Sequence, residues 1–170
     1  LSVVGSRQMC IRDRYNYYSN NLYQQATEIS VEYGTDFLAS NRMPAIRTNL
    51  NILSHLNNTR IMFIEPEGKV LLDTGYTHKA SKEDCLYEVE DFDYGSLNGE
   101  HSHLGNFFGL FNENMLSVYS PITSDFSIVG YVVINLPESV LTDRVYQTFN
   151  TNYLTLAICM ILSLSMLILY

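Results

Sequence analysis

Two groups of side chains in this sequence have types and spacings that could bind a metal ion. The first is acidic and consists of Glu88, Glu90, Asp91 and Asp93. Carboxylate oxygens are the ligands that Ca²⁺ and Mg²⁺ prefer, and a dense negative field also attracts cationic peptides. The spacing is not that of a calcium-binding loop, and acidic side chains are typically solvated. A cation site and a solvated acidic surface therefore both stay open.

The second group is a pair of histidines, His101 and His103. Side chains two residues apart on a strand point to the same face, so these two imidazoles could together ligate a metal. No third ligand is evident nearby, and two solvated loop histidines are the simpler interpretation. His55 and His78 are isolated in the sequence, and we expect both at the surface.

Residue patterns typical of catalysis are missing. Gly105 and Gly109 lie in a predicted hairpin rather than between a strand and a helix, so they do not form a phosphate-binding loop. No serine occupies a nucleophile-elbow pattern, and no nucleophile, base and orienting group can be assembled into a hydrolase site. We therefore expect no catalytic residues and no cofactor in this chain, which leaves open whether the parent protein is an enzyme.

Two helices are predicted to precede a sheet. Over residues 15–40, apolar side chains recur in steps of three and four, which places them on one face of a long helix: Tyr15, Tyr18, Leu22, Ala26, Ile29, Tyr33 and Phe37. Such a stripe packs either on the protein's own sheet or on a second copy. A second helix is predicted over residues 44–57, where Pro44 suits the first helical turn. Its apolar side chains recur in steps of four, three and three: Ile46, Leu50, Leu53 and Leu56.

The hydrophobic pattern changes to that of strands after the second helix. Residues 60–64 and 69–73 are apolar runs joined by a tight turn, in which Gly68 suits a positive φ. They predict a β-hairpin. Residues 74–99 are polar and acidic, and we expect a long excursion there with one short helix.

A second hairpin and a central strand follow in the sequence. Residues 103–111 and 115–120 predict the hairpin, and we expect Pro121 to end its second strand because proline has no N–H to donate. Residues 128–136 form the most β-branched stretch and predict a central strand of a sheet over about 60–136. Pro137 is expected to open a helix.

The two ends of the chain differ from the rest. Residues 153–170 contain no charge, proline or glycine, and as a helix they would extend roughly 27 Å, close to the ~30 Å apolar thickness of a bilayer. They predict a transmembrane helix; the alternative is a buried helix in a larger protein. Residues 1–14 resemble translated adapter sequence, and we interpret them as a non-native leader, with a native basic leader as the alternative.

Charge and composition exclude some partners. Residues 15–152, the predicted polar module, carry 7 Lys and Arg against 17 Asp and Glu, which is a net charge of −10. Nucleic-acid binding requires clustered cations that displace counterions from phosphates, so we expect no nucleic-acid partner. The hydrophobic content of 46% is sufficient for a packed core.

Two stretches connect this chain to a known family. The segments TRIMFIEPEGKVLLDT (59–74) and NMLSVYSPITSDFSIVGYVVINLPES (114–139), followed by an apolar helix, resemble the extracytoplasmic PAS-like, or single Cache, sensor domain of bacterial two-component sensor histidine kinases. The resemblance covers about residues 22–170. It implies an α+β fold in which a long N-terminal helix packs on a roughly five-stranded antiparallel sheet, followed by a transmembrane helix.

The resemblance also implies a function and a location. The module would be the signal input of a membrane-bound histidine kinase, passing the binding of a ligand or partner through its C-terminal helix to a HAMP linker and a cytoplasmic kinase. We expect a homodimer at the bacterial cell membrane, with the sensor domain extracytoplasmic and lipid around residues 153–170. The alternatives are a sensor domain of a chemoreceptor or cyclase, and a membrane-anchored binding protein with no kinase.

In domains of this family, small ligands lie between the sheet and the excursion that covers it. The positions that match in this chain are Arg60, Asp73, Tyr87, Phe107, Tyr119 and Tyr131. Arg60 is the cation near the first strand and could pair with a carboxylate ligand. A salt bridge between Arg60 and Asp73 is the alternative. The ligand class stays open among a small molecule, a cation and a protein partner.

Overall fold

The computed structural model describes the backbone of residues 2–38, 43–76, 86–97 and 99–169. The side chains of residues 2–12, 14, 35–38, 43–44, 96–97, 144–150, 152 and 167–169 fall outside the description. The chain forms two compact units, Leu1–Glu138 and Ser139–Tyr170, which are described separately.

The first unit is built on a six-stranded sheet in the order β3-β2-β1-β6-β5-β4, and all its pairings are antiparallel. The strands are β1 (Arg60–Ile64), β2 (Lys69–Asp73), β3 (Tyr87–Glu88), β4 (Ser102–Gly105), β5 (Met115–Ser124) and β6 (Ser127–Pro137). The most β-branched stretch, now β6, lies between β1 and β5 as predicted. The sixth strand is β3, whose two residues come from the polar excursion.

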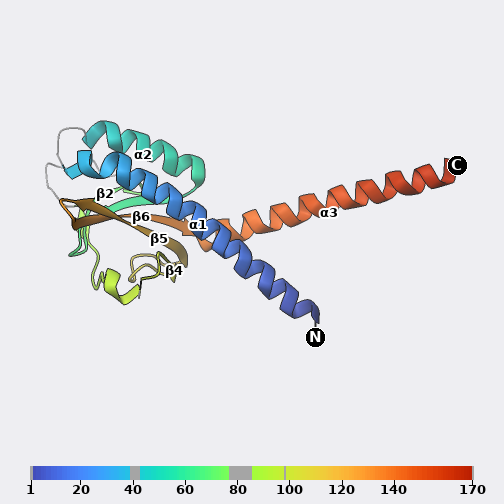
Figure 1. Ribbon diagram of the computed structural model, residues 1–170, viewed down its shortest axis with the longest axis horizontal. Helices are drawn as coiled ribbons and strands as arrows, with labels where there is room; N and C mark the ends of the chain where they lie inside the picture. Colours follow the sequence, from blue (N-terminus) through green and yellow to red (C-terminus); the bar gives the residue numbers. More distant parts are fainter. Residues whose placement is uncertain (1, 39–42, 77–85, 98, 170) are drawn as a thin grey trace. The chain divides into compact units, whose positions relative to one another are not determined.

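Two helices cover one face of this sheet (Figure 1). They are α1 (Ser2–Leu38) and α2 (Met43–Asn57). The predicted stripe on α1 is confirmed where its side chains are described, because Leu22, Ala26 and Ile29 are buried and the helix packs on β5 and β6. Gly34 lets α1 approach closely, since a Cβ there would lie 2.7 Å from Cγ2 of Ile122.

The helix boundaries differ from the expectation at one end. α1 begins at Ser2 rather than at residue 15, so its backbone continues through the segment 1–14 that we interpret as a leader. Whether that segment is native stays a prediction. The second predicted helix, 44–57, is confirmed as α2.

The buried side chains of α2 are not all members of the apolar row that the sequence predicts. Ile46 and Leu50 are buried, but Leu53 is 36% exposed and Leu56 is 75% exposed. Ser54 takes the inner position instead, and its hydroxyl donates to the backbone oxygen of Thr59 at 2.5 Å. The buried row therefore advances by four residues each time, which brings a small hydroxyl, and not a leucine, against the start of β1.

The first predicted hairpin is confirmed as β1 and β2, with Phe63 opposite Leu72 and Gly68 at φ +92° in the turn. The second predicted hairpin is confirmed in its pairing, but its first strand ends at Gly105. Extended structure stops there because Phe107 and Phe108 have φ of +48° and +51°.

The prediction that Pro121 ends a strand is wrong. β5 continues to Ser124, and Pro121 lies opposite Tyr131 of β6. The N–H of Tyr119 donates to His101 on the β4 side, and backbone N–H groups two residues apart point to the same side of a strand. An N–H group at position 121 would therefore point past the first residue of β4. The proline at this position consequently removes no hydrogen bond between β4 and β5.

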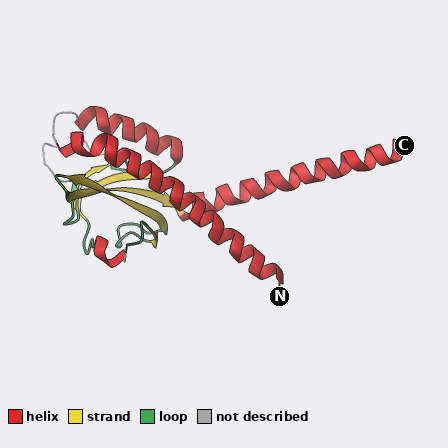
Figure 2. Ribbon diagram, viewed as in Figure 1, coloured by secondary structure: helices red, strands yellow, loops and turns green. Residues whose placement is uncertain are grey.

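The second face of the sheet is covered by loops and by the short 3-10 helix η1 (Tyr94–Leu97), which confirms the short helix expected in the excursion (Figure 2). Side chains from the segments 89–94 and 107–111 pack there. Part of that excursion, residues 77–85, lies outside the described residues. The loops bury an aromatic cluster against the sheet, so the core has an aliphatic side under the helices and an aromatic side under the loops.

The helix α3 (Glu138–Leu169) begins directly after β6, as the sequence predicts. Among its described side chains, those of residues 153–166 are exposed. Judged by length and apolarity, none of the helices could span a membrane over the residues that the structure describes. The predicted transmembrane segment 153–170 is therefore not confirmed, and its last residue lies outside the described residues.

Candidate functional site

The six predicted ligand-site residues all belong to the loop-covered face of the sheet. On β5, Ser120 and Ile122 point to α1, since Ser120 lies 3.3 Å from the Thr27 hydroxyl and Ile122 contacts Gly34. Side chains alternate along a strand, so Tyr119 points to the opposite face. Tyr119 lies in register with Val133 of β6, and both belong to the aromatic side of the core.

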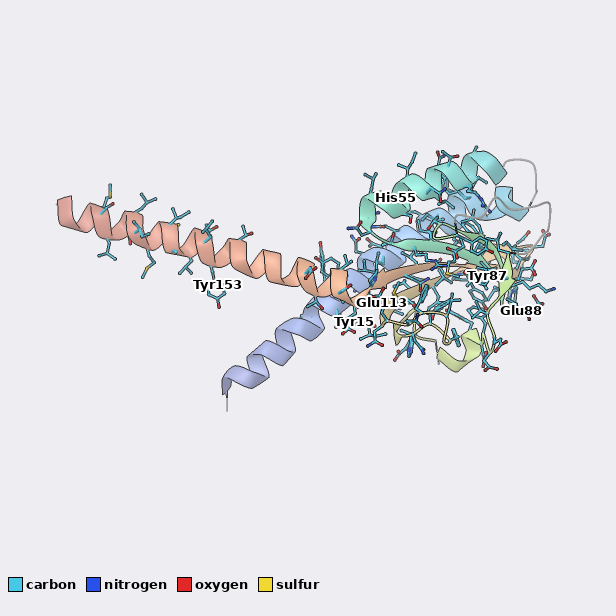
Figure 3. All side chains as sticks on the ribbon, turned by 180° about the vertical axis from the view of Figure 1, so that it is seen from behind. Tyr15, His55, Tyr87, Glu88, Glu113 and Tyr153 are labelled. Atoms are coloured by element: carbon cyan, nitrogen blue, oxygen red, sulfur yellow. The ribbon has the colours of Figure 1, made fainter. Side chains whose placement is uncertain are left out.

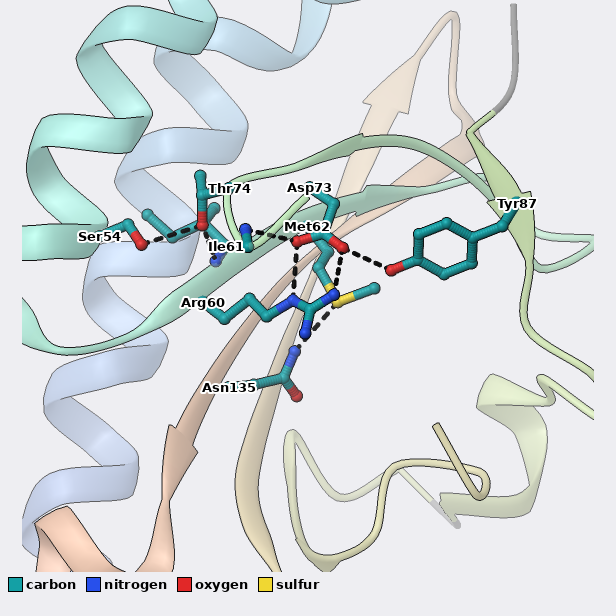
Figure 4. Close-up of polar contacts among 9 residues, drawn as sticks. Ser54, Arg60, Ile61, Met62, Asp73, Thr74, Tyr87 and Asn135 are labelled. Carbon is teal, nitrogen blue, oxygen red and sulfur yellow. Dashed lines mark hydrogen bonds and ion pairs between the residues drawn. The ribbon is translucent and has the colours of Figure 1, made fainter. Parts of the chain in front are cut away.

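The polar part of the site is a bidentate ion pair between Arg60 of β1 and Asp73 of β2 (Figure 4). Arg60 Nε donates to Asp73 Oδ1 at 2.8 Å, and Nη2 donates to Oδ2 at 2.5 Å. The Asp73 side chain is 0% exposed, whereas the Arg60 side chain is 30% exposed. Asp73 also accepts from the Tyr87 hydroxyl at 2.6 Å and from the Gly75 N–H at 2.8 Å.

These contacts change the proton affinities of the pair's neighbours. The hydrogen bond to Asp73 raises the pKa of Arg60, so the guanidinium stays charged. Burial, followed by the hydrogen bond to Asp73, raises the pKa of Tyr87 above its ordinary value of 10.0. The salt bridge that the sequence offered as the alternative for Arg60 is therefore present, and Tyr87 of β3 joins it through its hydrogen bond to Asp73 (Figure 4).

A buried amide extends the polar region and was missed by the sequence analysis. Asn135 of β6 lies opposite Arg60 in the register and is 0% exposed. Its Oδ1 accepts from the Ser117 hydroxyl at 2.6 Å, and its Nδ2 lies 3.2 Å from Met62 Sδ. The available signal was that Asn135 is the one amide side chain in the apolar run 128–136.

The apolar part of the site is a cluster of packed aromatic rings. Tyr131 stacks on Tyr94 of η1 with ring centroids 4.6 Å apart. Phe107 stacks on Tyr119 at 6.1 Å and is 1% exposed. Tyr131, Tyr119 and Phe107 were predicted from the sequence as site residues, but Tyr94 was not, although an aromatic residue in a polar excursion is itself a signal of burial.

Phe111 joins the polar and apolar parts and was also missed. Its ring lies 5.0 Å from Arg60 Cζ, so the guanidinium makes a cation–π contact on one side while it pairs with Asp73. Such contacts stabilise by about 0.5–2 kcal/mol, depending on desolvation. The contact places the segment before β5 directly over the ion pair.

The hydroxyl of Tyr119 is buried without a hydrogen-bond partner within the described part of the chain. The neighbouring Ser117 hydroxyl donates to Asn135 instead. Burial raises the pKa of Tyr119, so the hydroxyl keeps its proton. Buried polar groups are nearly always paired, and an exception therefore marks a position where a polar group of a ligand or a water would be favourable.

This arrangement is suited to binding rather than to acid–base chemistry. The carboxylate of Asp73 is saturated by Arg60, Tyr87 and Gly75, so it is not free to act as a base. The pair uses two of the five N–H groups of the guanidinium, which leaves donors for an anionic group. Aromatic rings and one partly exposed cation are a common lining for small-molecule sites.

The two metal-site hypotheses receive no support from the geometry. The acidic residues Glu88, Glu90, Asp91 and Asp93 are all exposed, and the carboxylate of Asp93 accepts from the Gly95 N–H instead. Among described residues, no three His, Cys, Asp or Glu side chains are grouped so that they could hold a metal ion.

The two histidines of the predicted pair lie in different surroundings. The ring of His101 packs against Tyr23 of α1 with centroids 4.6 Å apart, whereas His103 is exposed. His55 is exposed on α2, as expected (Figure 3), and His78 lies outside the described residues.

No protein-family model and no curated protein match this chain. Among solved structures, the chain is similar to the sensor domain of the Vibrio cholerae histidine kinase DctB, with 12% identity and a TM-score of 0.56 over 82% of this chain. It spans 58% of the length of that domain. At this identity the likeness shows the fold, so the expected PAS-like sensor-domain fold is confirmed.

Two further similar structures are sensor domains of the Campylobacter jejuni chemoreceptor Tlp3. One is in complex with 4-methylisoleucine, with 14% identity, a TM-score of 0.38, and coverage of 76% of this chain and 62% of that chain. The other has isoleucine bound, with 14% identity, a TM-score of 0.36, and coverage of 78% and 64%. Scores this low carry no weight for the fold or the ligand of this chain.

Proposed function

We propose that this chain is the signal-input module of a membrane-bound two-component sensor histidine kinase. The observation that carries the proposal is that the ion pair of β1 and β2 and the aromatic cluster lie on the same face of the sheet, whose strand β6 leads directly into α3. The similarity of the fold to a histidine-kinase sensor domain supports it.

Binding would act through a shift between two packings of the loop-covered face. A ligand carboxylate would accept from the Arg60 N–H groups that Asp73 does not use, and would meet the Tyr119 hydroxyl, which has no hydrogen-bond partner among the described residues. Because a ligand shifts an equilibrium only by its difference in affinity for the two states, these groups must be arranged differently in the bound form. The backbone of β6 would carry this change to Glu138, the first residue of α3.

The location and assembly are part of the same proposal. We propose that residues 153–170 anchor the protein in a bacterial cell membrane, that the sensor unit is extracytoplasmic, and that it acts as a homodimer. Exposed apolar side chains along α3, such as Leu156, Ile161 and Leu164, support the anchor. Protease treatment of cells tests the location. After the outer envelope is made permeable, we expect the sheet unit to be cleaved and α3 to be protected by the membrane.

A ligand screen on the full chain tests the sensor proposal. The thermal unfolding temperature is measured with carboxylates, amino acids, divalent cations and cationic peptides. A ligand at 100 times its dissociation constant stabilises by about 2.7 kcal/mol, which is a measurable shift. We expect a carboxylate-containing ligand to stabilise the chain, and Arg60→Ala to remove that shift relative to the variant's own unliganded value.

A matched control is available on the neighbouring strand. Lys69 is an exposed cation of β2, so Lys69→Ala removes the same charge without touching the ion pair and should keep the ligand shift. If only cations or basic peptides act, and neutralising Glu88 to Asp93 stops them, the acidic cluster is the sensor. If no small molecule acts, the small-ligand proposal fails.

The output domain is decided by the coding sequence that follows Tyr170. A phosphoacceptor histidine motif and ATP-binding motifs would support the kinase. A methyl-accepting or cyclase domain would instead make this the sensor of a chemoreceptor or cyclase. A stop codon just after Tyr170 would favour a membrane-anchored binding protein with no kinase.

A further inference from the structure

The segment Asn106–Asn114, which joins β4 to β5, combines backbone strain with contacts to both the ion pair and the start of α3. We call it the Phe loop because it contains Phe107, Phe108 and Phe111. It is closed by two backbone hydrogen bonds, from the Leu110 N–H to the Phe107 oxygen at 3.0 Å and from the Phe111 N–H to the Asn106 oxygen at 3.1 Å.

The strain lies in three consecutive residues with left-handed backbone. Phe107, Phe108 and Gly109 have φ of +48°, +51° and +79°. Glycine adopts this conformation freely, but a side chain with a Cβ is disfavoured in it, and a bulky aromatic residue there is a genuine outlier. Such conformations persist only where the surrounding structure holds them.

Aromatic packing holds the Phe loop in this conformation. The Phe107 ring is buried among Phe92, Phe108, Phe111 and Tyr119, with centroids 5.6 to 6.5 Å apart. The same rings enclose Tyr119, whose hydroxyl has no hydrogen-bond partner among the described residues. The closed loop therefore combines a strained backbone with a buried hydroxyl that lacks a partner among the described residues. Both features reduce the free energy that is needed to open the loop.

The far end of the Phe loop is joined to the first residue of α3. The backbone N–H of Glu138 donates to the Asn114 oxygen at 3.0 Å. The side-chain Nδ2 of Asn114 donates to the Glu138 carboxylate, also at 3.0 Å. At its near end the loop meets Arg60 through the ring of Phe111. One short segment thus contacts both the ion pair and the beginning of the C-terminal helix.

We propose that the Phe loop is a strained, displaceable cover of the Arg60 site, and that its opening releases the contact between Asn114 and Glu138 at the first turn of α3. The Phe loop would thus be a second path, besides the backbone of β6, by which a change at the Arg60 site reaches Glu138. As a route for a signal it rests on the proposed sensor function, but the coupling of the loop to Glu138 is a property of the chain without any ligand.

The test raises the strain of the loop without a steric clash. A Cβ added at Gly109 would meet nothing within 4 Å, so Gly109→Ala perturbs only the backbone. Hydrogen exchange of single amides is measured on the full chain. We expect the amides of Leu110 and Phe111 to exchange about tenfold faster, and the amide of Glu138, which is bonded to Asn114, to exchange faster with them.

Gly99 provides the matched control. It has φ +80° and also has nothing within 4 Å of an added Cβ, but it lies outside the Phe loop. Gly99→Ala should therefore leave the exchange of Leu110, Phe111 and Glu138 unchanged. If Gly109→Ala does not fold, Gly109→Asn makes a smaller perturbation of the same kind, because asparagine tolerates left-handed φ better.

Two results would overturn the inference. Faster exchange in the loop with an unchanged Glu138 amide would show that opening does not reach α3. Unchanged loop exchange in both Gly109 variants would show that the loop is not poised to open. The hydrogen-exchange experiment uses the chain without ligand, and its result does not depend on the ligand screen. A failure of the coupling between the Phe loop and Glu138 can therefore be distinguished from a failure of the sensor proposal.

Discussion

Replacing Arg60 by methionine should destabilise the fold strongly, because it leaves a buried carboxylate without its cation. Asp73 is 0% exposed and would retain only the Tyr87 hydroxyl and the Gly75 N–H as donors. Methionine keeps an unbranched apolar stem but lacks the guanidinium, and with it both hydrogen bonds to Asp73 and the cation–π contact with Phe111. The loss in stability can therefore be assigned to the guanidinium.

The expected size follows from the burial of the pair. Removing one partner of a buried ion pair typically costs 3–5 kcal/mol. Because the Arg60 side chain is 30% exposed, we expect the lower end, about 3 kcal/mol. In the Arg60→Met background, Asp73→Asn removes the buried carboxylate charge that has lost its cation. The amide oxygen can still accept the hydrogen bond from the Tyr87 hydroxyl. The second substitution should restore about 2 kcal/mol of that loss.

Urea unfolding of the full chain, followed by far-ultraviolet circular dichroism, measures these free energies. Lys69→Met is the control, since an exposed cation of the neighbouring strand should change stability by no more than about 0.5 kcal/mol. The reasoning fails if Arg60→Met costs less than about 1 kcal/mol. It also fails if adding Asp73→Asn destabilises the Arg60→Met variant further.

Two other predictions concern tyrosine hydroxyls of the same face. Tyr119→Phe removes a buried hydroxyl that has no hydrogen-bond partner among the described residues, so it should raise the free energy of unfolding in urea by about 1 kcal/mol; a loss of stability would show that the hydroxyl is paired. The raised pKa of Tyr87 means that the unfolded chain ionises first, so stability should fall as the pH rises above 10.0, the ordinary value. Unfolding at about pH 9 and about pH 11 should show a smaller fall in Tyr87→Phe, and an equal fall in both proteins would contradict this cause.

The sequence by itself determined the elements whose pattern is local. The stripe on α1, the turn at Gly68 and the apolar run of β6 each follow from spacing or residue type within one segment. They were predicted correctly because helix and strand periodicity reports which side of one element is buried. The order of elements also supported the sensor-domain resemblance, which the fold comparison confirmed at the level of the fold.

The tertiary structure decided the features that depend on residues far apart in the chain. Pro121 is tolerated inside β5 because β4 ends before it reaches that position. Ser54 takes the inner position on α2, where its hydroxyl accepts a hydrogen bond from the hydroxyl of Thr74, 20 residues further along the chain. Neither of these distant neighbours is visible in the local sequence.

The site shows the same division. Its candidate residues could be chosen by position from the resemblance, but their pairing could not. Arg60 contacts Phe111 because β1, β6 and β5 are neighbours in one sheet, and Asn114 contacts Glu138 because of the register between β5 and β6. Hydrogen bonds and ring contacts require ångström distances, and such distances between distant segments are set by packing, not by the order of residues.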